Sequence, residues 1–308
     1  MKEKLVVIVG PTAVGKTKLG VELAKKLNGE VLSGDSMQIY KRMDIGTAKV
    51  TEGEMEGIRH HLIDIKEPTE SFSVAEFQSL VKPLITKLNG ENKLPFLVGG
   101  TGLYVSSVIF DYNFPDVPSD LEYRQKMEDF VEKNGVVKLH DKLKEVDPIS
   151  FETIHPNNYR RVIRALEVFH VTNKTIHDFQ SDQPKLSQYD LVLIGLTMDR
   201  NLLYQRINAR VDMMIAEGLI EEARKLYESG VRDCQSVQAI GYKEIYDYIE
   251  GRTTKEQAVE TLKQNSRRYA KRQLTWFRNK MDINWFELTE TNFQENMQQI
   301  LKLIEERL

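Results

Sequence analysis

The fold is decided by the stretch LVVIVGPTAVGKT, residues 5–17. Its first five residues form an apolar run, which is typical of a strand buried inside a parallel sheet. The next eight residues match the pattern G-x-x-x-x-G-K-[ST] in full, and Leu19, Leu23 and Leu27 then follow at helical spacing. In such a strand–loop–helix unit, loop N–H groups surround a phosphate and the helix N-terminus adds partial positive charge. We therefore predict a parallel α/β sheet with a polyphosphate-binding loop.

Three further apolar runs extend this pattern. One ends at Leu32, and the others span Leu94–Val98 and Leu191–Leu196. Amphipathic stretches separate them, as expected for parallel strands joined by crossover helices. The predicted fold class is α/β: a P-loop NTPase-like parallel sheet with flanking helices, a mostly helical insertion domain and a helical C-terminal region.

The pattern changes in the middle of the chain, where Pro115 and Pro118 interrupt it. We predict that residues 1–110 and 186–308 form the P-loop α/β core with a helical C-terminal extension, and that residues 111–185 form the insertion. Helical patterns within the insertion cover residues 121–133, 136–143 and 158–171. After Asp199, an expected helix N-cap, a long helical pattern runs onward, with Gly218 and Gly230 as expected helix ends.

The overall composition is that of a globular protein, with 41% hydrophobic and 29% charged residues and a net charge of −3 over 308 residues. No apolar run approaches the ~20 residues that cross a bilayer, and because the first apolar stretch is too short for a secretory signal, we expect none. We expect a cytoplasmic protein, a monomer, with no membrane partner. The single cysteine, Cys234, cannot form an internal disulfide, and the six histidines offer no zinc framework.

Two residues of the phosphate loop have expected roles of their own. Lys16 should reach the outer phosphate oxygens, and the Thr17 hydroxyl should bind Mg²⁺. Motor ATPases place an acid at the end of a later strand, but here Leu94–Val98 is followed by Gly99-Gly100-Thr101. The loop therefore predicts a polyphosphate ligand outside the motor class, without saying which ligand.

Polar residues follow the second and third apolar runs. Asp35 comes after the run that ends at Leu32, and Thr101 comes after Leu94–Val98. Because the carboxyl ends of parallel strands face the ligand crevice, both side chains should lie there. An acid at this place can act as general base or metal ligand, and the alternative is an Asp that only forms a turn.

Arg206 and Arg210 lie four residues apart on the helix predicted after Asp199. Like charges at this spacing oppose helix formation, so an anionic partner would relieve them. A guanidinium over a polyphosphate would stabilise the charge that develops on the leaving oxygen. The alternative is a solvated helix face paired with acids such as Asp212.

The stretch 263–280 carries seven positive charges and no acid, and Tyr269, Trp276 and Phe277 interleave with them. Such a stretch suits phosphate neutralisation and base stacking, although a charged run is also typical of a solvated helix face. A second cluster, in the insertion, consists of Arg160, Arg161 and Arg164. Two basic clusters beside a phosphate-loop core favour an RNA ligand.

Taken together, these motifs resemble the tRNA dimethylallyltransferases, also called tRNA isopentenylpyrophosphate transferases, in their bacterial form. The resemblance covers most of the chain, through GPTAVGKT, GDSMQIYKRMDIGTAK, HHLID, LVGGTGLY, NNYRRVIRALEV, the RxxxRxxxM helix, QAIGYKE and RRYAKRQLTWFR. It implies that the phosphate loop holds dimethylallyl diphosphate instead of ATP. It further implies that the acceptor is N6 of the adenosine 3′ of the anticodon, position 37, in tRNAs reading codons that begin with U.

The resemblance also implies roles for single residues. Asp35 would be the base, Thr101 would position the adenosine, and Arg210 would stabilise the leaving diphosphate together with Lys16 and with Mg²⁺ at Thr17. The residues assigned to the diphosphate are Gly10, Pro11, Thr12, Ala13, Val14, Gly15, Lys16, Thr17 and Arg206. Those assigned to tRNA are Asp35, Ser36, Met37, Gln38, Thr101, Arg124, Arg160, Arg161, Arg164, Arg267, Arg268, Lys271, Arg272 and Trp276.

An adenosine stacked in an anticodon loop has to be flipped to reach a buried diphosphate, so a channel open at two ends is expected. Two other functions use the same residues. A nucleoside or metabolite kinase would bind ATP in the loop and use Asp35 to activate a hydroxyl. A non-catalytic RNA-binding module with a nucleotide switch would keep every activity when Asp35 is changed.

Overall fold

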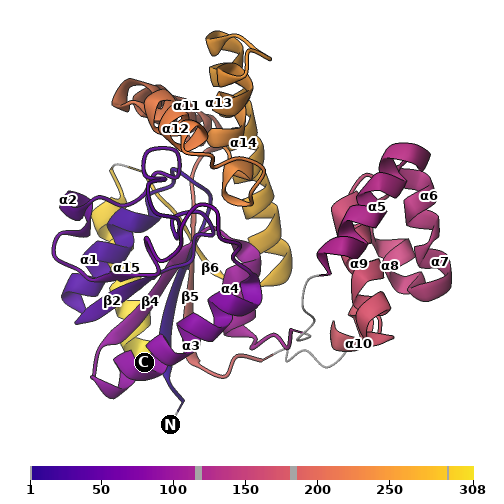
Figure 1. Ribbon diagram of the computed structural model, residues 1–308. Helices are drawn as coiled ribbons and strands as arrows, with labels where there is room; N and C mark the ends of the chain where they lie inside the picture. The colour runs from indigo at the N-terminus through magenta and orange to yellow at the C-terminus, as the bar shows by residue number, and fades with distance from the viewer. Residues whose placement is uncertain (1, 115–119, 181–185, 290) are drawn as a thin grey trace. The chain divides into compact units, whose positions relative to one another are not determined.

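The computed structural model describes residues 2–114, 120–180, 186–289 and 291–308 (Figure 1). The predicted chain breaks at Pro115 and Pro118 lie outside these residues. The chain divides into two compact units. Unit 1 consists of residues 1–109 and 187–308, and unit 2 of residues 110–186.

The sheet of unit 1 has six strands in the order β3-β2-β4-β1-β5-β6, and every neighbouring pair is parallel. The strands are β1 (Lys4–Val9), β2 (Gly29–Ser33), β3 (His60–His61), β4 (Leu94–Gly99), β5 (Asp190–Thr197) and β6 (Asn284–Glu287). The predicted α/β class and its four strands are confirmed. The prediction missed both edge strands, since β3 is two residues long and β6 is half-exposed, so neither has a continuous apolar run.

Helices cover both faces of this sheet (Figure 1). On one face, Val6 and Ile8 pack in a core with α1 and α15, to which Leu19 and Ile300 belong. Leu5 alternates to the other face, as successive side chains of a strand must, and α3 and α4 lie against β4. The helices of unit 1 are α1 (Lys16–Lys26), α2 (Glu52–Met55), α3 (Val74–Gly90), α4 (Gly102–Ile109), α11 (Arg200–Glu217), α12 (Leu219–Glu228), α13 (Tyr242–Ile249), α14 (Lys255–Lys280) and α15 (Phe293–Arg307).

The helix ends after β5 follow local chemistry. Asp199 caps α11, since its carboxylate accepts the N–H groups of Asn201 and Leu202 at 2.9 and 3.0 Å. Gly218 ends α11 with φ +104°, a left-handed conformation that costs glycine little. Gly230, also at positive φ, follows α12. All three predicted helix boundaries are confirmed.

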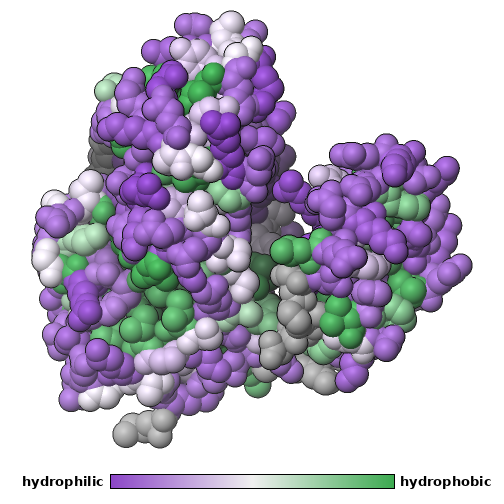
Figure 2. Space-filling view, viewed as in Figure 1, coloured by the Kyte–Doolittle hydropathy of each residue, from purple (hydrophilic) through white to green (hydrophobic). Residues whose placement is uncertain are grey.

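Unit 2 is a helical bundle with a core of its own, which includes Met127, Leu139, Leu143, Val162 and Leu166. Its helices are α5 (Leu121–Asn134), α6 (Val136–Asp141), α7 (Leu143–Val146), α8 (Pro148–Thr153), α9 (Tyr159–Thr172) and α10 (Ile176–Gln180). The surface of the bundle that Figure 2 shows is mostly hydrophilic. The helix predicted over 136–143 is confirmed as far as Asp141; there the N–H of Lys142 bonds to the carbonyl of Leu139, a tighter turn that separates α6 from α7.

No helix of the described residues is long and apolar enough to cross a membrane.

Candidate active site

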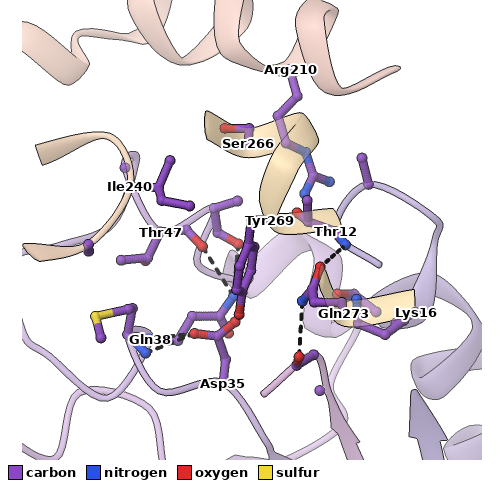
Figure 3. A pocket seen from close by; sticks show the side chains of 18 of the residues that line it. Thr12, Lys16, Asp35, Gln38, Thr47, Arg210, Ile240, Ser266, Tyr269 and Gln273 are labelled. Atoms are coloured by element: carbon purple, nitrogen blue, oxygen red, sulfur yellow. Dashed lines mark hydrogen bonds between the residues drawn. The ribbon is translucent and has the colours of Figure 1, made fainter. Parts of the chain in front are cut away.

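Unit 1 contains a cavity of about 490 Å³ at the carboxyl ends of β1, β2 and β4, where ligands bind in open parallel sheets. Its walls come from the phosphate loop, the segment after β2, α11 and α14 (Figure 3). The structure places the following predicted site residues on its lining: Thr12, Ala13, Gly15, Lys16, Thr17, Asp35, Ser36, Met37, Gln38, Arg210 and Arg272.

The phosphate loop needs its first glycine for space. A Cβ on Gly10 would lie 2.6 Å from the carbonyl oxygen of Leu196 on the neighbouring strand β5. The loop then closes at Gly15, with φ +105°, where α1 begins. Gly10, Pro11 and Val14 do not line the cavity but form the frame of the loop. The other five residues of the loop line the cavity around the N-terminus of α1, the place where a helix attracts an anion.

Lys16 faces the cavity from the first residue of α1. Its ammonium donates to the carbonyl oxygens of Gly10 and Pro11 at 3.0 and 2.8 Å. Burial by the cavity walls lowers the pKa of Lys16 to about 8; Asp35 counteracts this and Arg210 adds to it. Although part of the side chain is accessible from the cavity, its charge is largely withdrawn from water, so an anion there would be strongly held.

Arg210 points into the cavity from α11, toward the loop residues Thr12 and Lys16 (Figure 3). Burial lowers the pKa of Arg210, and Glu54 acts in the opposite direction. Arg206, one turn earlier, does not line the cavity; its guanidinium lies 3.9 Å from the sulfur of Met198. The alternative pairing of these arginines with Asp212 is not what the structure contains, because Asp212 bonds to Lys263 at 2.7 Å.

Asp35 lies at the other end of the cavity, in the turn after β2. Its Oδ1 accepts the N–H groups of Met37 and Gln38 at 2.8 and 3.4 Å. Burial raises the pKa of Asp35, and the N–H of Met37 and the charge of Lys16 counteract part of that rise. A partly desolvated carboxylate held in one orientation is a better base than one in water.

Thr101, which we predicted to face the ligand crevice, is not on the cavity lining; instead it connects the turn after β4 to the turn after β2. Its Oγ1 accepts the N–H of Ser36 at 3.1 Å. The two turns come close because Gly99 has no side chain: a Cβ there would lie 2.3 Å from the carbonyl oxygen of Gly34. The side-chain amide of Gln38 is fixed by the carbonyl oxygens of Thr47 and Ala48, at 3.4 and 3.0 Å.

Two residues of α14 at this site were not among the predicted ones. Tyr269 lines the cavity beside Asp35 (Figure 3). Burial raises its pKa to about 12, Asp35 adds to the rise, and hydrogen bonding with Thr101 counteracts part of it. Gln273 is buried and bonds to the phosphate loop. The available signal was the spacing of four residues between them, which puts both on the same side of a helix whose neighbouring positions are largely basic.

The other predicted residues of α14 divide into two groups. Arg268 and Lys271 are exposed, as is Arg272 at the edge of the cavity. Arg267 donates to Asn208 Oδ1 on α11 at 2.6 Å, and Trp276 Nε1 donates to Ser106 Oγ on α4 at 3.4 Å. The last two therefore hold α14 against its neighbours.

In unit 2, two of the four arginines that we predicted to bind tRNA are exposed, and the other two pair with a buried carboxylate. Arg160 and Arg161 are exposed on α9. Arg124 donates to both oxygens of Glu167 at 2.8 and 2.9 Å, and Arg164 donates to one at 2.6 Å. Burial disfavours the charge of Glu167, but these hydrogen bonds outweigh it and lower the pKa of that carboxyl.

Beside the loop, the exposed Thr17 offers its hydroxyl oxygen to a divalent cation from the cavity lining. Among the described residues, no three His, Cys, Asp or Glu side chains gather as a metal site. Mg²⁺ binds well through a single protein ligand when phosphate and water oxygens supply the rest, so this arrangement fits a phosphate-bound Mg²⁺.

The parallel sheet carries a glycine-rich loop, with the half-buried Lys16 and Arg210 at one end of a cavity and the half-buried Asp35 at the other. This arrangement is typical of an α/β enzyme that acts on a phosphorylated ligand. The family model described as "IPP transferase" matches residues 38–280. The chain is 61% identical over 309 residues to a tRNA dimethylallyltransferase of Halalkalibacterium halodurans, covering 100% of this chain and 98% of that protein. It is 60% identical to the tRNA dimethylallyltransferase of Geobacillus thermodenitrificans, with the same coverage.

Solved structures agree. The full-length tRNA isopentenylpyrophosphate transferase from Bacillus halodurans superposes with a TM-score of 0.77 at 60% identity, covering 99% of this chain and 97% of that one. A eukaryotic dimethylallyltransferase described as acting on tRNA has a TM-score of 0.83 at 30% identity, covering 99% of this chain and 80% of that one. The chain belongs to the IPP transferase family and is an enzyme, a prenyltransferase of the tRNA dimethylallyltransferase type.

Proposed function

We propose that this enzyme transfers the dimethylallyl group of dimethylallyl diphosphate to N6 of the adenosine 3′ of the anticodon, position 37, in tRNAs that read codons beginning with U. The observation that supports this is one cavity with two chemically different ends. Lys16, Arg210 and the phosphate loop lie at one end and Asp35 at the other, and Thr101 bonds to the turn of Asp35 from outside the lining. We infer that the substrate is tRNA because the names of the relatives state it.

At the cationic end, the diphosphate would lie on the loop N–H groups and the N-terminus of α1. As the bond from C1 of the prenyl group to its bridging oxygen breaks, negative charge moves onto the diphosphate. Lys16 and Arg210 would stabilise that charge more than they stabilise the bound substrate, because their ammonium and guanidinium are already in place and poorly solvated.

At the other end, the adenosine amino group is a weak nucleophile, since its lone pair is delocalised into the ring. As N6 forms its bond to C1, a proton has to leave N6, and Asp35 would accept it. The raised pKa of Asp35 favours this transfer, while the charge of Lys16 keeps the carboxylate available. Thr101, hydrogen-bonded to the N–H of Ser36, would hold the turn that carries Asp35.

The tRNA would meet the exposed basic face of α14, and the base would flip into the cavity beside Tyr269, whose ring can stack on it. In unit 2, Arg160 and Arg161 are free of the ion pairs that hold Arg124 and Arg164, so they are the arginines that we assign to tRNA phosphates. We retain a cytoplasmic, monomeric enzyme as part of the proposal.

Mg²⁺ belongs to the proposal as well. The Thr17 hydroxyl would hold it beside the diphosphate. When bound, it would neutralise charge on the diphosphate oxygens. Lys16 and Arg210 orient the same oxygens from the protein side.

The test is incubation of the enzyme with Mg²⁺, radiolabelled dimethylallyl diphosphate and unmodified tRNA, beside a parallel reaction with labelled ATP. We expect label in tRNA, recovered as N6-modified adenosine after digestion, and no consumption of ATP. Consumption of ATP with no label in tRNA would instead support the kinase alternative. Binding of tRNA with neither reaction would support a non-catalytic module.

A further inference from the structure

Gln273 joins the two ends of the cavity through one side chain. Its Oε1 accepts the N–H of Thr12 in the phosphate loop at 2.9 Å. Its Nε2 donates to the carbonyl oxygen of Gly100, in the turn that carries Thr101, at 3.0 Å. Figure 3 shows both bonds. The residue is 5% exposed, and the sequence separations are 261 and 173 residues, so no local structure explains these contacts.

The turn after β4 packs closely against this amide. A Cβ on Gly100 would lie 2.1 Å from Gln273 Nε2, so the turn sits directly against the amide. The same helix contributes Tyr269 and Arg272 to the cavity lining. The loop and the turn therefore both bond to one side chain of α14, an amide that can donate and accept at once.

We propose that Gln273 is a positioning residue that fixes the separation between the phosphate loop and the Gly100–Thr101 turn, and with it the distance between C1 of the prenyl donor and N6 of the adenosine. This rests on the proposed function above. The reacting atoms in such a transfer have to lie about 3–3.5 Å apart, and a misplacement of about 1 Å can cost about 100-fold in rate. Glutamine fits because the loop offers an N–H and the turn offers a carbonyl.

The first test is Gln273→Met, which keeps the size and removes both hydrogen bonds. We expect kcat to fall about 100-fold, while the dissociation constants for inorganic diphosphate and for tRNA, each measured alone, stay within about threefold of wild type. The matched control is Gln298→Met, at an exposed position of α15, which should leave kcat unchanged. A kcat equal to wild type in folded Gln273→Met would overturn the proposal.

The second test is Gln273→Glu, and it also serves if Gln273→Met does not fold. The ionised carboxylate can accept from Thr12 but faces the carbonyl of Gly100 with a second acceptor, whereas the protonated acid can donate to it. Burial raises the pKa of an introduced carboxyl, so the ratio of variant to wild-type kcat should rise as the pH falls from 8 to about 5. Titratable or charged groups that share the cavity lining with this position are Lys16 and Lys18 of α1, Asp35, Glu54 of α2, Arg210 of α11, and Tyr269 and Arg272 of α14. Gln273→Met, measured over the same pH range, shows the pH dependence that these groups cause without the introduced carboxyl.

A ratio that does not change with pH would contradict the proposal, because a merely structural residue would lose stability without this proton-dependent rescue. Loss of affinity for both substrates with kcat retained would contradict it too. If the wild-type enzyme transfers no prenyl group at all, the proposed function fails. If wild type is active and both variants match it, only the role of Gln273 fails.

Discussion

The phosphate loop and the region around Asp35 face the same cavity, but they are built differently. The loop is eight consecutive residues, 10–17, whose shape follows from two glycines and the start of α1. The region around Asp35 is assembled from the turn after β2, the turn after β4 and α14. A local motif can be recognised in a sequence, whereas an assembled region depends on helix packing. The shape of the loop should therefore tolerate changes elsewhere, while the second region, and its distance from the loop, should respond to changes far away in the chain.

The largest effect on activity is expected in the region around Asp35. Asp35→Asn keeps the hydrogen bonds from Met37 and Gln38 but removes the base, so the single-turnover rate of prenyl transfer should fall by about 10²–10⁴. The affinity for tRNA, measured by filter binding, should stay close to that of wild type. The control is Asp190→Asn, at an exposed position at the start of β5. An unchanged rate would remove Asp35 from the chemistry.

At the loop end, Arg210→Ala should slow turnover by about 100-fold and raise the KM for dimethylallyl diphosphate, because it removes a preorganised charge from the leaving group. Binding of tRNA should persist. Steady-state kinetics with varied diphosphate substrate measures both parameters. Arg224→Ala, at an exposed position of α12, is the matched control. Wild-type kinetics in Arg210→Ala would place the diphosphate elsewhere.

The exposed basic face of α14 is the surface that we expect to bind the tRNA next to Asp35. Replacing Arg268, Lys271 and Arg272 together by glutamine should reduce tRNA affinity and lower the slope of log Kd against log salt by about 2–3. The control replaces three exposed lysines of α1, α3 and α15, which are Lys26, Lys87 and Lys302. Equal salt slopes in the triple variant and wild type would show α14 to be only a solvated face.

Unit 2 offers a similar comparison between an arginine that bonds to a distant residue and an arginine that is exposed. Arg124→Ala leaves the buried Glu167 with fewer donors, so the free energy of unfolding should fall by about 1–3 kcal/mol. Arg161→Ala, at an exposed position, should leave stability unchanged and weaken tRNA binding. Urea unfolding of the two variants gives the comparison. Equal free energies of unfolding would mean that the bonds from Arg124 to Glu167 do not stabilise unit 2.

The smallest effect concerns pH. Since burial holds the pKa of Lys16 at about 8, its ammonium is charged below pH 8 and loses its proton above it. Affinity for inorganic diphosphate, measured by calorimetry between pH 6.5 and 9.5, should therefore weaken several-fold above pH 8. In Lys16→Arg the guanidinium stays charged, so the affinity should change less. The same decline in both proteins would assign the titration to another group.

The sequence predicted the fold class, four of six strands and the boundaries at Asp199, Gly218 and Gly230, because each depends on neighbouring residues. It could not predict β6, whose pairing with β5 depends on how the chain returns to the sheet after α14. It placed Asp35 and Arg210 on one cavity, since strand ends and a helix pattern point there.

The sequence alone could not predict contacts between helices that lie far apart in the chain. Arg164 pairs with Glu167 three residues later on the same helix, which the sequence could have indicated, but nothing local predicts that Arg124, 43 residues away, bonds to the same carboxylate. Likewise, Arg267 and Trp276 resemble RNA-binding residues in the sequence, yet they hold α14 to α11 and α4. The dual hydrogen bonding of Gln273 becomes visible only when the loop and the turn are brought together.

The central claim is that one cavity holds the diphosphate at one end and the flipped adenosine at the other. The most direct measurement is a crystal structure of the enzyme with an unreactive analogue of dimethylallyl diphosphate and an anticodon stem–loop. We expect the diphosphate on residues 10–17 and the adenosine N6 within about 3.2 Å of an Asp35 carboxylate oxygen. A diphosphate bound outside the loop, or an adenosine that remains stacked in the RNA, would contradict the account.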